Sequence, residues 1–110
     1  MSLNKKNRLK KKKDFEAVFK KGKAVRSVFL FVRYLGNNLG FPRIAFVVSS
    51  KVSKKAVVRN RFRRIIAEAV SKNLKDIQSA DIIVIADKKI TGALKDEIVH
   101  DTDNIFNKIK

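Results

Sequence analysis

The stretch RIAFVVSSKVSKKAVVRNRFRR, residues 43–64, decides the fold because it joins a short strand to a strongly basic helix. Residues 43–49 are mostly β-branched or aromatic, which favours a strand. Ser53 is a predicted N-cap, and apolar residues recur at helical spacing from there to about Asn73. The predicted buried stripe of this helix consists of Val58, Phe62, Ile65 and Ala69.

The other side of the predicted helix, together with the loop before it, is crowded with positive charge. Seven of the fourteen residues 51–64 are Lys or Arg and none is acidic. Like charges packed on one helix face repel each other and cost stability, so a polyanionic partner is the natural reason to keep them. We therefore interpret this face as a nucleic-acid contact, in which an asparagine amide can both donate and accept hydrogen bonds. The predicted contact residues are Lys51, Lys54, Lys55, Arg59, Asn60, Arg61, Arg63 and Arg64.

The charge of the whole chain is just as uneven. Residues 1–64 hold 20 Lys and Arg against two acids, a net charge of +18, whereas residues 65–110 have a net charge of −1. A pI near 10.6 indicates nucleic acid first and an anionic membrane surface second. No apolar run approaches the roughly 20 residues of a membrane span, no secretory signal is visible, and there is no cysteine. We expect one cytoplasmic domain over residues 1–110 that binds nucleic acid, with no membrane partner.

The remaining segments extend this pattern in both directions. Residues 3–13 form a lysine-rich arm with little to bury, expected to be mobile at about residues 1–10. A short helix is predicted from Asp14, as N-cap or first-turn acid, to about Gly22. Residues 24–35 read as one strand, which a turn at 36–42 would pair with residues 43–49 as a hairpin.

The C-terminal part is predicted to supply a strand and a helix. Residues 82–86 (IIVIA) are wholly apolar, as expected for a central strand. Residues 91–110 form an amphipathic helix that Thr91 could cap, with Leu94, Ile98, Ile105, Phe106 and Ile109 buried. The order α-β-β-α-β-α predicts an α+β two-layer sandwich with a mixed sheet. The strands on either side of the basic helix would be parallel if they are neighbours.

The sequence offers little that could catalyse a reaction by itself. Metal-dependent nucleases gather carboxylates, but the basic half contains only Asp14 and Glu16. There is no Cys/His metal set, no phosphate-binding Gly-rich loop and no G-x-S-x-G motif. His100, the single histidine, lies in the acidic half beside Asp101 and is expected at the surface. We predict no catalytic residue and no metal site in this chain.

Residues 56–64 (AVVRNRFRR), preceded by SKVSKK and by the strand RIAFVVS, resemble the RNR motif of the bacterial ribonuclease P protein subunit. Residues 11–23 (KKKDFEAVFKKGK) are similar to the first helix of that family, so the resemblance covers nearly the whole chain. It implies an RNA-binding subunit of an endoribonuclease, in which a catalytic RNA with its Mg²⁺ ions removes 5′ leaders from precursor tRNA. It also implies a left-handed βαβ crossover, against the right-handed default, and no obligate protein partner.

The resemblance assigns roles to individual residues. It places the RNR helix against the catalytic RNA near the cleavage site, and the single-stranded leader in a cleft lined by aromatic residues. Two positions depart from the family, because Ala67 stands where many members carry a further Arg and Ser50 where a second Lys is frequent. The residues implied in leader binding are Lys11, Phe15, Phe19, Val32 and Tyr34.

Several alternatives stay open at this point. Phe15 and Phe19 could equally form an ordinary core stripe, and either face of the strand at 29–34 could line the cleft. A structural RNA-binding protein such as a ribosomal protein would share the charge, size and fold. A DNA-binding regulator is a second rival, although no helix-turn-helix pairing precedes the basic helix. The identity of the RNA that copurifies with the protein would separate these readings.

Overall fold

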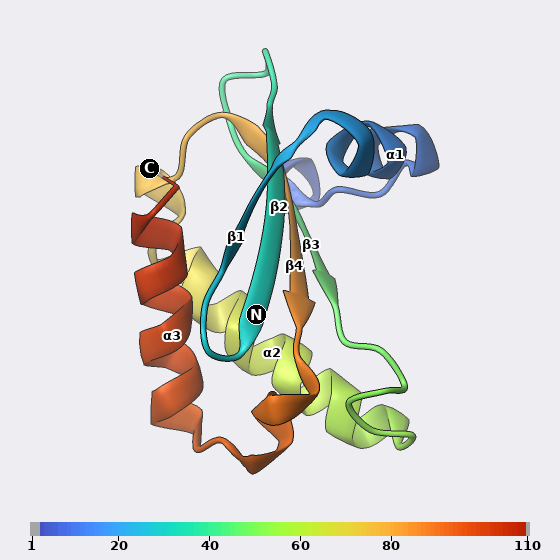
Figure 1. The fold of residues 1–110 in the computed structure, drawn as a ribbon. Coiled ribbons are helices and arrows are strands. Elements are labelled where there is room, and N and C mark those ends of the chain that lie inside the picture. Colours follow the sequence, from blue (N-terminus) through green and yellow to red (C-terminus); the bar gives the residue numbers. More distant parts are fainter. Residues whose placement is uncertain (1–2, 110) are drawn as a thin grey trace.

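The computed structural model describes residues 3–109, and its central feature is a four-stranded sheet with helices on both faces (Figure 1). Helices α2 and α3 cover one face, and α1 lies over part of the other. The α+β class and the mixed sheet are confirmed. The elements are α1 (Lys12–Lys21), β1 (Lys23–Arg26), β2 (Leu30–Gly36), β3 (Arg43–Val47), α2 (Ala56–Lys72), β4 (Ala80–Ala86) and α3 (Lys95–Asn107), with short 3-10 turns at Lys5–Asn7, Leu74–Asp76 and Lys88–Gly92.

The strands lie in the order β1-β2-β4-β3. β1 and β2 are antiparallel, as are β2 and β4, whereas β3 and β4 are parallel. The apolar strand β4 is therefore central, as its sequence predicts. Helix α2 connects β3 to β4, so the predicted parallel adjacency of these two strands is confirmed. The hand of this crossover stays a prediction from the family resemblance.

The N-terminal strands differ from the sequence-based prediction. Residues 24–35 form two strands, β1 and β2, and not one, and the predicted pairing with residues 43–49 is wrong because β2 pairs with β4. The turn between β1 and β2 contains no Gly or Pro and is held from a distance by Asp101 of α3. The Asp101 carboxylate accepts hydrogen bonds from the Ser27 hydroxyl (2.6 Å) and from the backbone N–H groups of Val28 (3.2 Å) and Phe29 (2.9 Å).

The helix boundaries also shift. Asp14 lies in the first turn of α1, which begins at Lys12. Ser53 does not cap α2, because its hydroxyl accepts a hydrogen bond from the N–H of Lys55, the residue directly before the helix. The predicted C-terminal helix begins later than expected, since Thr91 belongs to a separate 3-10 turn. Leu94 is the N-cap of α3, and at 70% exposure it is not part of the core.

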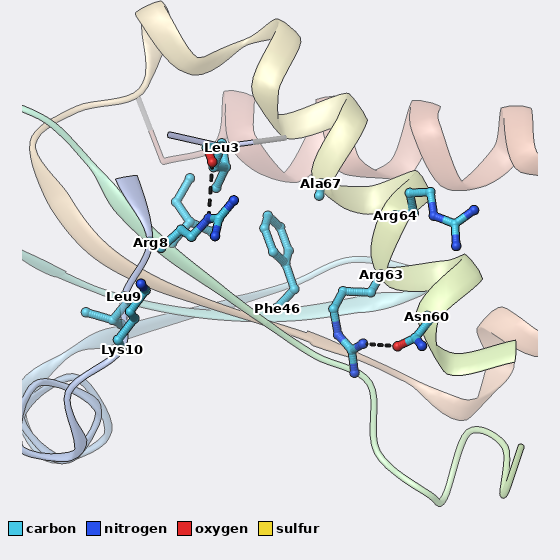
Figure 2. Close-up of a pocket in the computed structure, with 10 residues that line it drawn as sticks. Leu3, Arg8, Leu9, Lys10, Phe46, Asn60, Arg63, Arg64 and Ala67 are labelled. Carbon is cyan, nitrogen blue, oxygen red and sulfur yellow. Dashed lines mark hydrogen bonds between the residues drawn. The ribbon is translucent and has the colours of Figure 1, made fainter. Parts of the chain in front are cut away.

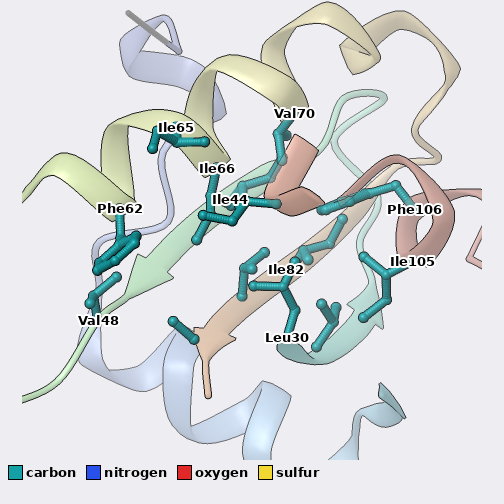
Figure 3. Close-up of a cluster of buried hydrophobic side chains, with 14 of the residues drawn as sticks. Leu30, Ile44, Val48, Phe62, Ile65, Ile66, Val70, Ile82, Ile105 and Phe106 are labelled. Carbon is teal, nitrogen blue, oxygen red and sulfur yellow. The ribbon is translucent and has the colours of Figure 1, made fainter. Parts of the chain in front are cut away.

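The main core fills the space between the sheet and the α2–α3 pair (Figure 3). Of the predicted α2 stripe, Phe62, Ile65 and Ala69 are buried, while Val58 is only half-buried. Burying one Val, Leu or Ile side chain contributes roughly 1.5–3 kcal/mol. Because the main core contains most of the buried apolar side chains, it accounts for most of the stabilisation of the fold. Its largest fully buried members include Leu30, Val32, Ile44, Ile66, Val70, Ile82, Val84, Ile98 and Ile105.

The N-terminal segment is packed, which corrects the expectation of an arm with little to bury. Leu3, Asn7 and Leu9 are buried. The Leu9 N–H donates to the Ile44 carbonyl (3.1 Å), and the Asn7 side chain donates to the Pro42 carbonyl (2.8 Å). Residues 1 and 2 of the predicted arm, and Lys110 at the other end, lie outside the described residues. Two leucines and one asparagine therefore anchor a segment whose composition suggests only a charged tail.

Candidate RNA-binding surfaces

The loop before α2 presents its lysines from a fixed frame. Val48 and Val52 are buried, and the Val52 N–H donates to the Ser49 carbonyl at 3.0 Å. These anchors hold a short loop whose lysines, Lys51, Lys54 and Lys55, are all exposed. The loop therefore continues the basic face of α2.

The basic residues of α2 fall into two groups. Asn60, Arg61 and Arg64 are exposed and point away from the core. Arg59 and Arg63 are half-buried and take part in internal hydrogen bonds. Arg59 donates to the Ser53 carbonyl at 2.9 Å, which ties the lysine loop to the helix, and Arg63 donates to the side-chain oxygen of Asn60. The sequence pattern alone missed this positioning role of Arg59.

The α1 side of the sheet carries rows of side chains that are set by the strand register. One row crosses all four strands as Arg26, Phe31, Ile85 and Val47. The Arg26 guanidinium lies 4.8 Å from the centre of the Phe31 ring, a cation–π contact. Phe31 and Ile85 are half-buried and Val47 is 37% exposed, so α1 leaves this row open to solvent.

Helix α1 borders this open row and contributes one exposed aromatic ring. Phe19 is 48% exposed, and the Arg33 guanidinium lies 5.7 Å from the centre of its ring. Arg33 also donates to the Phe19 carbonyl at 2.6 Å, which fixes the end of α1 over β2. Phe15 is half-buried against the smaller cluster of Leu9, Val18 and Ile83, while Lys11 is exposed just before the helix. Phe19 is thus available to a ligand and Phe15 only in part.

Two predicted leader-binding residues lie on the face of β2 that is turned away from α1. Val32 is 0% exposed and belongs to the main core, so its assignment to the cleft is wrong. Tyr34, on the same face of β2, is half-buried and packs against that core. Successive side chains of a strand point to opposite faces, so the α1 side of β2 carries Phe31, Arg33 and Leu35 instead. An arginine in the middle of an otherwise apolar strand was the available signal for this face.

An ion-pair network joins α1 to the sheet. Arg43 of β3 binds Asp81 of β4 through two hydrogen bonds (2.8 and 2.7 Å) and lies 3.4 Å from Asp14 of α1. The hydrogen bond to Asp81 raises the pKa of Arg43 above its usual value, so this arginine stays charged. Within residues 3–109 these are the only salt bridges, and the other cations of the basic half have no carboxylate partner there.

Neither a metal centre nor a membrane span is found in the described part of the chain. Residues 3–109 contain no group of three or more His, Asp or Glu side chains placed to hold a metal ion. None of the helices over the same residues is both long enough and apolar enough to cross a membrane.

Comparison with known proteins identifies the family to which the chain belongs. The family model for Ribonuclease P matches residues 3–110. A ribonuclease P protein component from Thermoanaerobacter sp. (strain X514) is 43% identical over 89 residues, covering 78% of this chain and 74% of that protein. One from Alkaliphilus metalliredigens is 34% identical over 94% of both chains. The solved RNase P protein of Staphylococcus aureus superposes with a TM-score of 0.88 at 30% identity over 94% and 95% of the two chains. The RNase P protein of Thermotoga maritima gives 0.85 at 28% identity over 94% and 97%. With this match along almost its whole length, the chain belongs to the ribonuclease P protein family.

Proposed function

We propose that this chain binds the catalytic RNA of ribonuclease P through the lysine loop and α2, and the 5′ leader of precursor tRNA across the α1 side of the sheet. As a ribonuclease P protein component, it forms part of an endoribonuclease and works with the RNA subunit. The observation that carries the proposal is the α1 side of the sheet, where partly exposed aromatic rings lie beside arginines. Phe19 with Arg33, and Phe31 with Arg26, form two such pairs.

Each surface suits a different part of an RNA. Proteins that hold single strands stack bases on aromatic rings while Lys and Arg follow the phosphates, which is what the α1 side offers. The face built by α2 and its loop offers a dense set of exposed cations, which suits the backbone of a folded RNA. Because α1 and α2 lie on opposite faces of the sheet (Figure 1), both RNAs can be bound at once.

The division of labour follows from the distribution of acids. Of the two acids in the basic half, Asp14 is engaged with Arg43 and Glu16 is exposed on α1. These residues do not fit a site that holds catalytic Mg²⁺, so we assign the Mg²⁺ ions and the bond cleavage to the RNA subunit. The protein contributes positive charge that offsets the repulsion between enzyme RNA and substrate RNA. We expect it to act in the cytoplasm and to need no second protein.

Cleavage measured across a Mg²⁺ titration tests the proposal. The protein alone should leave precursor tRNA intact, and the RNA subunit with the protein should cleave it at lower Mg²⁺ than the RNA subunit alone. Leader contacts should also make precursor tRNA bind more tightly than mature tRNA, which lacks the leader. Cleavage by nuclease-free protein without RNA, abolished by Glu16→Gln, would refute the division of labour. An unchanged Mg²⁺ requirement would refute the electrostatic role.

A further inference from the structure

A cavity of about 470 Å³ opens at the border of the basic face of α2, whose residues Asn60, Arg63 and Arg64 form one of its walls (Figure 2). It lies between the N-terminal segment, the outer edge of β3 and α2. Its volume falls in the range of roughly 300–1,000 Å³ that is typical of small-molecule sites. The lining residues are Leu3, Arg8, Leu9, Lys10, Ile44, Phe46, Asn60, Arg63, Arg64 and Ala67.

The floor of the cavity is apolar and its rim is cationic. Leu3, Leu9, Ile44 and Ala67 are buried, and the half-buried ring of Phe46 stands up from β3 between the N-terminal segment and α2 (Figure 2). The rim carries four cations, and none of the ten lining residues is acidic. Since the salt bridges within residues 3–109 all involve Arg43, the rim cations have no carboxylate partner in the described structure. The rim residues are Arg8, Lys10, Arg63 and Arg64.

The edge of β3 adds hydrogen-bonding groups to the wall. The Ile44 carbonyl points outward and accepts the hydrogen bond of the Leu9 N–H. Backbone groups two residues apart in a strand point the same way, so the N–H and C=O of Phe46 face the same outer edge, beyond the last contact with the N-terminal segment. On the α2 side, the Asn60 amide accepts from Arg63 and retains its own N–H donors. Donors and acceptors thus surround an apolar floor.

We propose that this cavity receives one unstacked nucleobase of the catalytic RNA, with the flanking phosphates on the rim cations. The inference rests on the proposed function, because it takes α2 to face that RNA. A phosphate alone would gain nothing from an apolar floor, and an acidic or apolar peptide would not need both a ring to stack on and four cations. A splayed-out base uses all three features, since it offers a flat face, polar edges and two adjoining phosphates.

Ala67 gives a clean test because its small side chain keeps the cavity open from the α2 side. Ala67→Leu should fill the cavity with apolar atoms without changing the charge of the surface, whereas Ala67→Ser keeps it open and serves as the matched control. We expect Ala67→Leu to bind the catalytic RNA on the order of 10-fold more weakly, as for one lost base stack. The slope of log affinity against log salt should stay unchanged, because no phosphate contact is removed. Thermal unfolding of both variants verifies that the domain is intact.

Chemical probing of the Watson–Crick edges of the RNA bases supplies a second readout. Wild-type protein and Ala67→Ser should protect one unpaired nucleotide of the catalytic RNA, and folded Ala67→Leu should leave it reactive. If wild type binds the RNA and Ala67→Leu gives the same affinity and the same protections, the cavity proposal fails while the proposed function stands. If the lost protection lies in the leader of precursor tRNA instead, the assigned RNA is wrong. If wild type does not bind the catalytic RNA at all, the proposed function itself fails.

Discussion

The two faces of the sheet are built from the same strands and have opposite characters. Toward α2 and α3, strands β2 and β4 present Leu30, Val32, Ile82 and Val84, all almost completely buried. Toward α1, the alternate residues of β2 include Phe31 and Arg33, which are only half-buried. One step along β2 therefore separates a residue that stabilises the fold from one that is available to a ligand. We therefore expect substitutions at Phe31 or Arg33 to change binding more than stability, and substitutions at Leu30 or Val32 to do the reverse.

The largest expected difference between the faces is in stability. Ile82→Ala removes a fully buried side chain from the main core and should lower the free energy of unfolding by roughly 2–5 kcal/mol. Ile85→Ala, in the same strand but on the open row, should cost clearly less because Ile85 is only half-buried. Urea unfolding of the two variants measures the difference. Equal losses would mean that the α1 side is as much a core as the other face.

Asp101 links the two faces of the sheet. It belongs to α3, yet its carboxylate fixes the turn that positions Arg26 and Phe31 on the other side. Asp101→Ala leaves three donors without their acceptor and should cost about 3 kcal/mol of stability. Amide hydrogen exchange at Val28 and Phe29 should accelerate more than exchange in β4. Uniform acceleration over the whole sheet would indicate a global loss of stability and no special role in the turn.

The β1–β2 turn is a part of the fold that could not be predicted from the sequence. Strand β4 and the α2 stripe were predictable because their signals are local, a short apolar run and a helical period. The β1–β2 turn was not, because the carboxylate that holds it lies more than 70 residues away in the chain. The face of β2 was ambiguous because bulky apolar residues occupy both of its sides, and Val32 was assigned to the wrong one. The cavity beside α2 depends on three separated segments, so no single stretch of sequence indicates it.

Neighbouring residues of β2 test the separation of binding from stability. Phe31→Ala should weaken binding of precursor tRNA to the holoenzyme by roughly 1–2 kcal/mol if a base stacks there, and should leave mature tRNA almost unaffected. Phe19→Ala should behave in the same way. Val32→Ala is the matched control, since it should lower thermal stability and change the two tRNA affinities alike. If Phe31→Ala instead changes both affinities equally, the open row does not hold the leader.

The smallest expected effect distinguishes the phosphate-binding face from the base-stacking face. Arg61 and Arg64 are exposed on α2, so Arg61→Gln and Arg64→Gln should leave thermal stability unchanged and weaken binding of the catalytic RNA only several-fold. Each lost phosphate contact should reduce the slope of log affinity against log salt by roughly 0.7–0.9. Phe31→Ala should leave that slope unchanged, because stacking releases no counterions. Arg59→Gln is a less suitable probe, since Arg59 also holds the lysine loop through the Ser53 carbonyl.

If the slope is the same in wild type and in the Arg61 and Arg64 variants, these arginines do not contact phosphates. The catalytic RNA would then have to bind through another part of the basic half.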